Sequence, residues 1–157
     1  IAGQKVLGSM EFACSVAGAK LVLVMGHTSC GAVKSAVELF SAQKSAADET
    51  GCKHLDAVVS EVQKCIDPVT CDAHDASCEE DHAAYVNEVA RRNVERTIAL
   101  IRRDSETLDA LVRAGQIDIV GGIYDVRTGL VEMFRGTHHD AAPSASPASE
   151  RQLMAAS

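Results

Sequence analysis

The residues with the clearest potential for chemistry are a histidine and a cysteine three positions apart, His27 and Cys30, in the segment GHTSCG at positions 26–31. An imidazole nitrogen and a thiolate are both suitable zinc donors. A turn that directs both side chains toward one ion would therefore form part of a zinc site. The alternative is a polar histidine at the exit of a strand beside a half-buried cysteine, because H-x-x-C is a short motif.

The elements around this pair are predicted from the apolar pattern. The run KLVLVM at positions 20–25 predicts a strand covered on both faces in a parallel sheet, and a helix is predicted from Ala32 to about Ala42. In open α/β sheets, ligands collect beyond the carboxyl ends of the strands, which is where the turn at positions 26–31 lies. Cys30 begins the following helix, whose dipole would stabilise the thiolate, the form that binds zinc.

The rest of the chain alternates between helical and strand patterns, which indicates an α/β domain. Helices are predicted at positions 6–17, 54–66, 83–103, and from Asp104 or Ser105 to just before Gly115. A strand at 117–124 and a tight turn at 127–129 lead into a strand at 130–134. We expect a mostly parallel central sheet flanked by helices, with this hairpin at its C-terminal edge. Cys14 and Phe12, in the first helix, are expected to be buried.

Length and composition restrict the class of protein. The 157 residues suffice for one domain, placed at residues 1–136, and the Ala-, Ser- and Pro-rich segment 137–157 is expected to be a disordered tail. A net charge of -7 and 3% aromatic residues argue against nucleic acid and against an anionic membrane surface as partners. Six cysteines in a well-patterned chain favour a reducing compartment, so we expect a cytoplasmic protein.

A second set of possible metal donors lies in and beside the acidic stretch at positions 69–81, which is expected to be a surface insertion. Its members are Cys71, His74, Cys78 and His82. Their residue types suit zinc, but their spacing is not one of the usual finger patterns. A metal site, a disulfide between Cys71 and Cys78, and exposed thiols without a role all stay open, and the acidic neighbours favour the last.

Three separated blocks of the sequence resemble the β-class carbonic anhydrases. LGSMEFA at 7–13, the apolar run and GHTSCGAV at 26–33 are similar to that family's G-S-[LM]-E-[YF]-A helix, strand and G-H-T-x-C-G-A turn. The others are the helix from Asn93 to Ser105, and GGIYDVRTG at 121–129, which is similar to the family's G-x-x-Y-D-[VL]-x-T-G hairpin. Three blocks in the right order are more specific than any one of them.

The resemblance implies a zinc ion held by two cysteines and one histidine, with water or a carboxylate in the fourth position. His27 and Cys30 would be the second and third of these protein ligands. The first cysteine and the catalytic Asp–Arg pair belong to a C-x-D-x-R segment, which would lie before Ile1. We therefore expect an N-terminally truncated β-carbonic anhydrase that contains part of the metal site and neither member of that catalytic pair.

The implied activity is zinc-dependent, reversible hydration of carbon dioxide to bicarbonate in a homodimer or higher homo-oligomer, because sites in the family lie close to a subunit interface. With two ligands, the chain as given is expected to be inactive. One alternative is a non-catalytic homologue or regulatory domain without a complete metal site. A nucleotide-binding module is disfavoured, because GHTSCG lacks both G-x-G-x-x-G and G-x-x-x-x-G-K-[ST].

Overall fold

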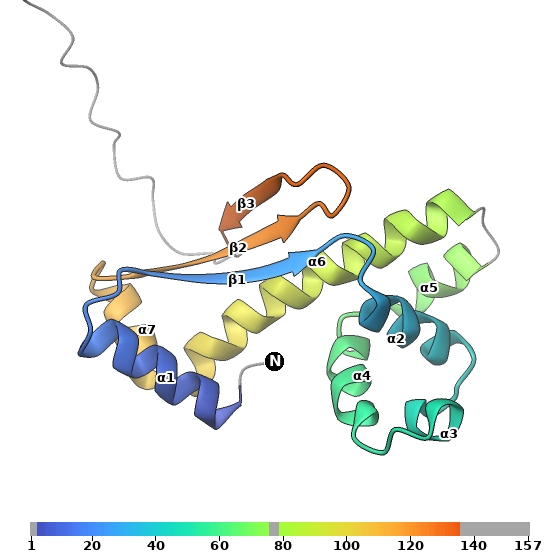
Figure 1. The fold of residues 1–157 in the computed structure, drawn as a ribbon, viewed down its shortest axis with the longest axis horizontal. Coiled ribbons are helices and arrows are strands. Elements are labelled where there is room, and N and C mark those ends of the chain that lie inside the picture. The colour runs from blue at the N-terminus through green and yellow to red at the C-terminus, as the bar shows by residue number, and fades with distance from the viewer. Residues whose placement is uncertain (1–2, 76–78, 136–157) are drawn as a thin grey trace, which may run out of the picture.

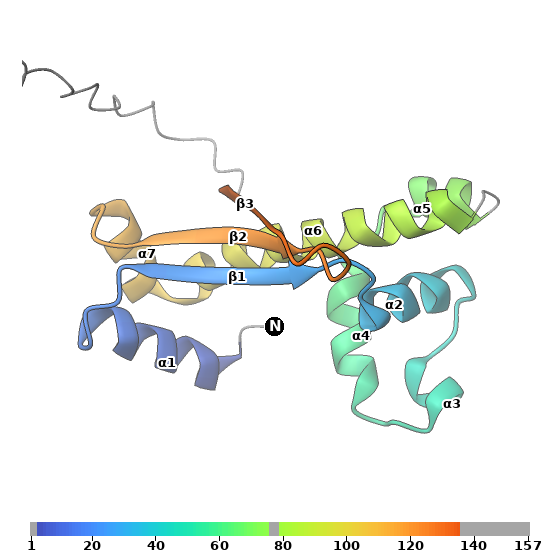
Figure 2. The same ribbon diagram turned by 45° about the horizontal axis from the view of Figure 1, so that its top comes forward.

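A three-stranded sheet runs through the middle of the protein, whose structure is a computed structural model describing residues 3–75 and 79–135 (Figure 1). The strands are β1 (Leu21–His27), β2 (Asp118–Tyr124) and β3 (Val131–Arg135). The helices are α1 (Gln4–Ser15), α2 (Gly31–Ser41), α3 (Ala46–Thr50), α4 (Leu55–Gln63), α5 (Pro68–Asp75), α6 (Glu79–Asp104) and α7 (Glu106–Arg113). α2 to α5 gather beyond the end where β1 finishes, and α1 and α7 lie toward the other end (Figures 1 and 2).

The sheet is small and mixed, with the strand order β1-β2-β3. β1 and β2 are parallel, in a register that pairs Leu21 with Asp118 and His27 with Tyr124. β3 returns antiparallel to β2, pairing Val131 with Tyr124. The predicted fold class is confirmed: an α/β domain in which a parallel pair is followed by an edge hairpin and flanked by helices.

α6 connects the two hydrophobic clusters of the described residues. Its N-terminal half contributes Val86 and Val89 to a cluster with α2 and α4, and its C-terminal half contributes Ile98 and Ile101 to a cluster with the sheet, α1 and α7. These positions form the single apolar stripe of an amphipathic helix. Each such side chain stabilises the fold by about 1.5–3 kcal/mol when fully buried. No helix within the described ranges is both long enough and apolar enough to cross a bilayer.

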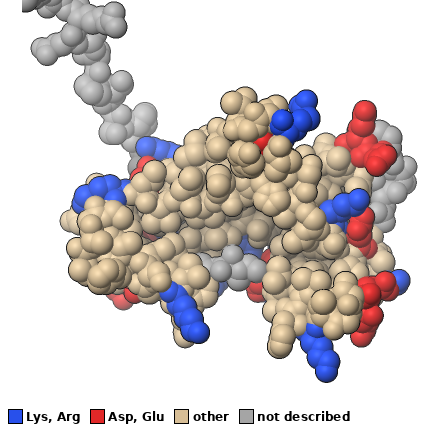
Figure 3. Space-filling view, viewed as in Figure 1, with Lys and Arg blue, Asp and Glu red and all other residues tan. Residues whose placement is uncertain are grey.

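The prediction that β1 is covered on both faces is wrong for the described residues. Leu21, Leu23 and Met25 are between 44% and 56% exposed, whereas the alternating residues face α6. The surface over the strands shows few charged side chains in Figure 3. A continuous apolar run predicts a strand but does not say which faces neighbouring helices cover. Phe12, also expected to be buried, is 62% exposed.

Two segments expected to be irregular contain helices. α3 lies in the polar segment 41–53, for which the sequence predicts a loop, and the Ser45 side chain there accepts a hydrogen bond from the Asp48 N–H. α5 lies in the expected surface insertion and begins at Pro68, a residue that suits the first turn of a helix. Cys71 of α5 is only 1% exposed, and its Sγ lies 3.2 Å from Ser41 Oγ. The prediction that Cys71 is an exposed thiol is therefore wrong, because the helix turns it into the core.

Ser105 links α1 to α7. It is buried at the N-cap of α7, where its Oγ accepts a hydrogen bond from the Leu108 N–H at 3.2 Å. The same hydroxyl donates to Glu11 Oε1 at 2.5 Å. Of the two caps that the sequence allowed, Asp104 and Ser105, the structure uses Ser105. One hydroxyl therefore satisfies a helix end and fixes the packing of two helices.

We expect Ser105→Ala to lower the free energy of unfolding by about 1–3 kcal/mol, because it removes the N-cap of α7 and leaves the Glu11 carboxylate without the Ser105 hydroxyl as a donor. Urea unfolding followed by circular dichroism measures this loss. Ser9→Ala is the matched control, since the Ser9 hydroxyl only donates to the Lys5 carbonyl oxygen on the exposed side of α1. Equal effects of the two substitutions would contradict the importance of the Ser105 contacts.

Candidate metal centre

His27 and Cys30 lie on either side of the turn that joins β1 to α2. His27 is the last residue of β1 and is exposed, beside Tyr124 at the end of β2. Cys30 is the N-cap residue of α2, is half-buried, and has extended backbone angles of φ -68° and ψ 115°. Its side chain makes no capping hydrogen bond. The thiol is therefore not engaged in closing the helix, and both candidate ligands lie at the carboxyl edge of the parallel pair.

The orientation of the His27 ring is set by its neighbour. His27 Nδ1 lies 3.0 Å from the carbonyl oxygen of Thr28. Because a carbonyl oxygen can only accept, this contact requires a proton on Nδ1, which leaves the lone pair on Nε2. Metal-binding histidines are commonly oriented by a hydrogen bond of this kind. The types of donor, an imidazole Nε2 and a cysteine sulfur, both fit zinc.

Thr28 attaches the turn to the β2–β3 hairpin. Its N–H donates to the Tyr124 carbonyl oxygen at 2.9 Å, and its Oγ1 accepts from the Val126 N–H at 3.1 Å. The hairpin is closed in turn by the Asp125 carboxylate, which accepts from the Arg127 N–H at 2.8 Å. That hydrogen bond is the largest of the effects that lower the pKa of the Asp125 carboxyl. The β1–α2 turn and the β2–β3 turn are thus hydrogen-bonded to each other beside His27.

Ser29 occupies an unusual backbone conformation between the two candidate ligands. Its φ of 55° lies in the left-handed region, which costs a non-glycine residue about 1–2 kcal/mol. Its N–H donates to Asn87 Oδ1 of α6 at 3.0 Å, and a hydrogen bond contributes about 0.5–1.5 kcal/mol. The bond therefore offsets a large part of the conformational cost. Ser29 and Asn87 also line a cavity of about 220 Å³.

Gly26, directly before His27, permits a close approach of α6 to β1. A Cβ at this position would lie 2.9 Å from Val94 Cγ2 and 3.1 Å from Ile123 Cδ1. Contacts that short require a neighbour to move, and the β-branched Val94 has little rotamer freedom in a helix. The helix that builds the core therefore contacts the backbone immediately before the first candidate ligand.

The described residues do not complete a metal site. Among the described residues, 3–75 and 79–135, no group of three or more His, Cys, Asp or Glu side chains could hold a metal. The side chains of residues 72–75 are not among those that the structure describes. Of the second predicted set, Cys71 is buried and His82 lines the 220 Å³ cavity. The side chain of His74 and the whole of Cys78 lie outside what the structure describes. A metal site or disulfide in that segment stays a prediction.

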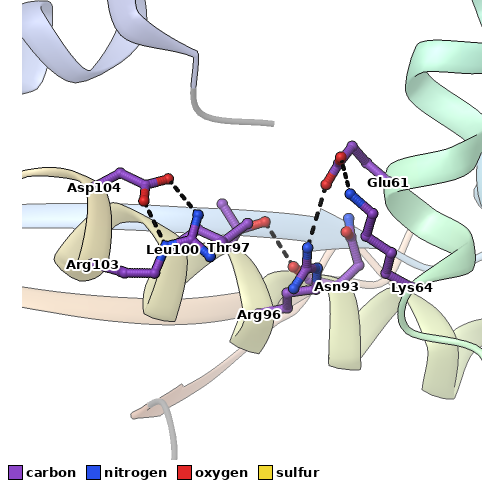
Figure 4. A pocket seen from close by; sticks show the side chains of 8 residues that line it. All are labelled: Glu61, Lys64, Asn93, Arg96, Thr97, Leu100, Arg103 and Asp104. Carbon is purple, nitrogen blue, oxygen red and sulfur yellow. Dashed lines mark hydrogen bonds and ion pairs between the residues drawn. The ribbon is translucent and has the colours of Figure 1, made fainter.

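A second cavity, of about 320 Å³, is lined by residues of α4 and α6 and by Lys64 (Figure 4). Glu61 contacts both Lys64 and Arg96, and Arg103 pairs with Asp104. The Lys64 hydrogen bond is the largest of the effects that lower the pKa of Glu61. The cations of this cavity thus already have carboxylate partners, and none of the lining residues is a candidate ligand. Glu61 and Lys64 are three residues apart, a spacing that brings side chains together on one side of a helix.

The chain resembles known proteins in both sequence and fold. A sequence model of the family described as Carbonic anhydrase matches residues 2–131. The chain is 30% identical over 124 residues to Carbonic anhydrase 2 of Mycobacterium tuberculosis (strain CDC 1551 / Oshkosh), covering 79% of this chain and 53% of that protein. It therefore spans about half the length of the curated relatives that it matches.

Solved structures show the same fold. The β-carbonic anhydrase CafA of Aspergillus fumigatus aligns with a TM-score of 0.64 and 25% identity, covering 87% of this chain and 59% of that one. A structure from work on two tetrameric β-carbonic anhydrases of Sordaria macrospora aligns with a TM-score of 0.64 and 18% identity, covering 83% and 60%. At that identity the second match shows the fold alone.

We expect Gly26→Ala to lower the free energy of unfolding by about 1–3 kcal/mol, because the added methyl group overpacks the contact with Val94. Gly8→Ala is the control: a Cβ at Gly8, inside α1, would meet nothing within 4 Å. That substitution should stabilise the protein by about 0.5–1 kcal/mol. Both are measured by urea unfolding. A gain in stability for both variants would show that α6 does not constrain Gly26.

Proposed function

The chain belongs to the β class of the carbonic anhydrase family, and from this we propose that it serves the zinc-dependent, reversible hydration of carbon dioxide to bicarbonate. His27 and Cys30 would be two of the protein ligands. The observation that supports this most directly is their placement on one turn at the carboxyl edge of the parallel strands, with His27 Nδ1 engaged by Thr28. A zinc ion held there would supply a Lewis acid that activates water near neutral pH.

The residues of the turn have separate tasks in this proposal. His27 offers the Nε2 lone pair, since its other ring nitrogen donates to the Thr28 carbonyl oxygen. Cys30 offers its sulfur from the N-cap position of α2, where the side chain makes no capping hydrogen bond. Thr28 fixes the turn against the hairpin, so that the imidazole stays at the strand end.

We further propose that the site is completed by donors outside the described residues. Catalytic zinc sites normally have three protein ligands, and the described residues provide two candidates. The third ligand would be a cysteine of a C-x-D-x-R segment, which would also bring the Asp–Arg pair. The uncovered apolar face of β1 supports a homodimer or larger homo-oligomer. The proposed reducing, cytoplasmic setting is supported by the five cysteines within the described residues, none of which pairs with another of the five.

The 157-residue chain alone is expected to bind Zn²⁺ weakly and not to hydrate carbon dioxide, because two protein ligands do not form a strong site. The protein that carries the C-x-D-x-R segment is expected to bind one zinc ion per chain and to be active. In that protein, His27→Ala or Cys30→Ser should remove both zinc and turnover. Metal content by mass spectrometry and stopped-flow hydration of carbon dioxide measure these outcomes.

His54→Ala and Cys52→Ser are matched controls, because both residues are exposed and belong to the segment between α3 and α4, outside the turn at positions 26–31. They should leave zinc content and turnover unchanged. Stoichiometric zinc with activity in the 157-residue chain would refute the incomplete site. Zinc retained by the His27 and Cys30 variants would refute the ligand assignment. A longer protein that lacks the first cysteine and takes up no zinc would favour the alternative, a non-catalytic homologue.

A further inference from the structure

We propose that Asn87 is a positioning residue for the metal centre, acting through the backbone of Ser29. This inference rests on the proposed function. Asn87 lies on α6 and its Oδ1 accepts the Ser29 N–H at 3.0 Å, across 58 positions of the sequence. It is neither a candidate zinc ligand nor a group that touches substrate. We propose that it holds the Ser29 backbone in the conformation that orients Cys30 relative to His27.

The conformation of Ser29 matters because this residue lies in the short turn between β1 and α2, and each of these elements is held in place by its own contacts. On one side, β1 is fixed by its ladder with β2, which continues through the Thr28 N–H. On the other side, α2 is fixed by three buried side chains, Val33, Ala36 and Val37. A change of φ at Ser29 would therefore rotate the start of α2, and Cys30 with it, relative to His27.

A comparison with Gln43 shows why the Asn87 contact is more than a local turn bond. Ser29 and Gln43 are the two non-glycine residues with positive φ in the described part of the chain. The Gln43 N–H donates to the carbonyl oxygen of Phe40, three residues earlier, as is usual just after a helix end. The Ser29 N–H instead donates to a side chain on a distant helix. The left-handed conformation of Ser29 is thus set by tertiary structure.

The chemistry of the contact defines the informative substitutions. A backbone N–H can only donate, so the amide oxygen of Asn87 must face it. Asn87→Asp keeps an acceptor at this place, and Asn87→Ala removes it. Alanine is a better helix former than asparagine, so Asn87→Ala does not weaken α6 through its helix propensity. A loss that appears in Asn87→Ala and is absent in Asn87→Asp therefore reports on the acceptor.

The test is a titration of the 157-residue chain with Co²⁺ alone, in which the thiolate-to-metal absorption band measures the amount of Co²⁺ bound. We expect Asn87→Ala to weaken Co²⁺ binding about fivefold, the equivalent of one hydrogen bond. Asn87→Asp should bind at least as tightly as the unchanged chain, since it restores the acceptor. Asn93→Ala is the matched control, because Asn93 lies on the same helix and contacts Cys65 Sγ at 3.9 Å instead. Loss of the same hydrogen bond should lower the free energy of unfolding of the metal-free Asn87→Ala chain by about 0.5–1.5 kcal/mol, with the chain still folded at the temperature of the titration.

Exchange of the Ser29 amide hydrogen in the metal-free chain, followed by NMR, provides a readout that needs no metal. It should be about fivefold faster in Asn87→Ala and unchanged in Asn87→Asp and Asn93→Ala. Unchanged exchange in Asn87→Ala would overturn the inference, because the contact would then not restrain the turn. Equal weakening of Co²⁺ binding by Asn87→Ala, Asn87→Asp and Asn93→Ala would also overturn it, as would unfolding of the Asn87→Ala chain at the temperature of the titration.

His27→Ala separates failure of this inference from failure of the proposed function. If His27→Ala abolishes Co²⁺ binding while Asn87→Ala binds normally, the metal centre stands and Asn87 has no positioning role. If His27→Ala binds Co²⁺ as well as the unchanged chain, the proposed centre fails, and the inference about Asn87 fails with it.

Discussion

The contact between α6 and the end of β1 is the constraint on which the candidate site depends. At Gly26 the helix lies so close to the strand that no side chain fits without displacing Val94. The same helix joins both hydrophobic clusters and places Asn87 beside Ser29. Core packing and the geometry of the turn therefore share one element. A shift of α6 along the sheet would alter the core and the turn together.

Much of the fold could be predicted from the sequence because the strongest patterns are local. The apolar run before Gly26 and the apolar stripe of α6 are continuous over many residues, and both elements lie where they were predicted. The cap at Ser105 and the hairpin after Tyr124 follow from short signals of serine, threonine and glycine. The turn between His27 and Cys30 belongs to this class, since a strand and a helix border it.

The parts that sequence reasoning missed depend on contacts between distant segments. The hydrogen bond from Ser29 to Asn87 joins residues with no shared motif. The exposure of Leu23 and Met25 depends on which faces the helices cover, which an apolar run does not specify. Cys71 has acidic neighbours in the sequence, yet the helix that begins at Pro68 buries its thiol. In each case the local pattern is compatible with more than one tertiary environment.

The position of β1 in the sheet has a consequence for handling the chain in solution. In the described part of the protein, β1 is an edge strand, and from Leu21 to Gly26 it contains neither a charge nor a proline. Unprotected edges of this kind template pairing with other chains and lead to aggregation. The tendency rises with protein concentration, because the first step is an encounter between molecules. Dilute samples, or a lysine at an outward-facing position of β1, would keep such self-association from obscuring the properties of the single chain.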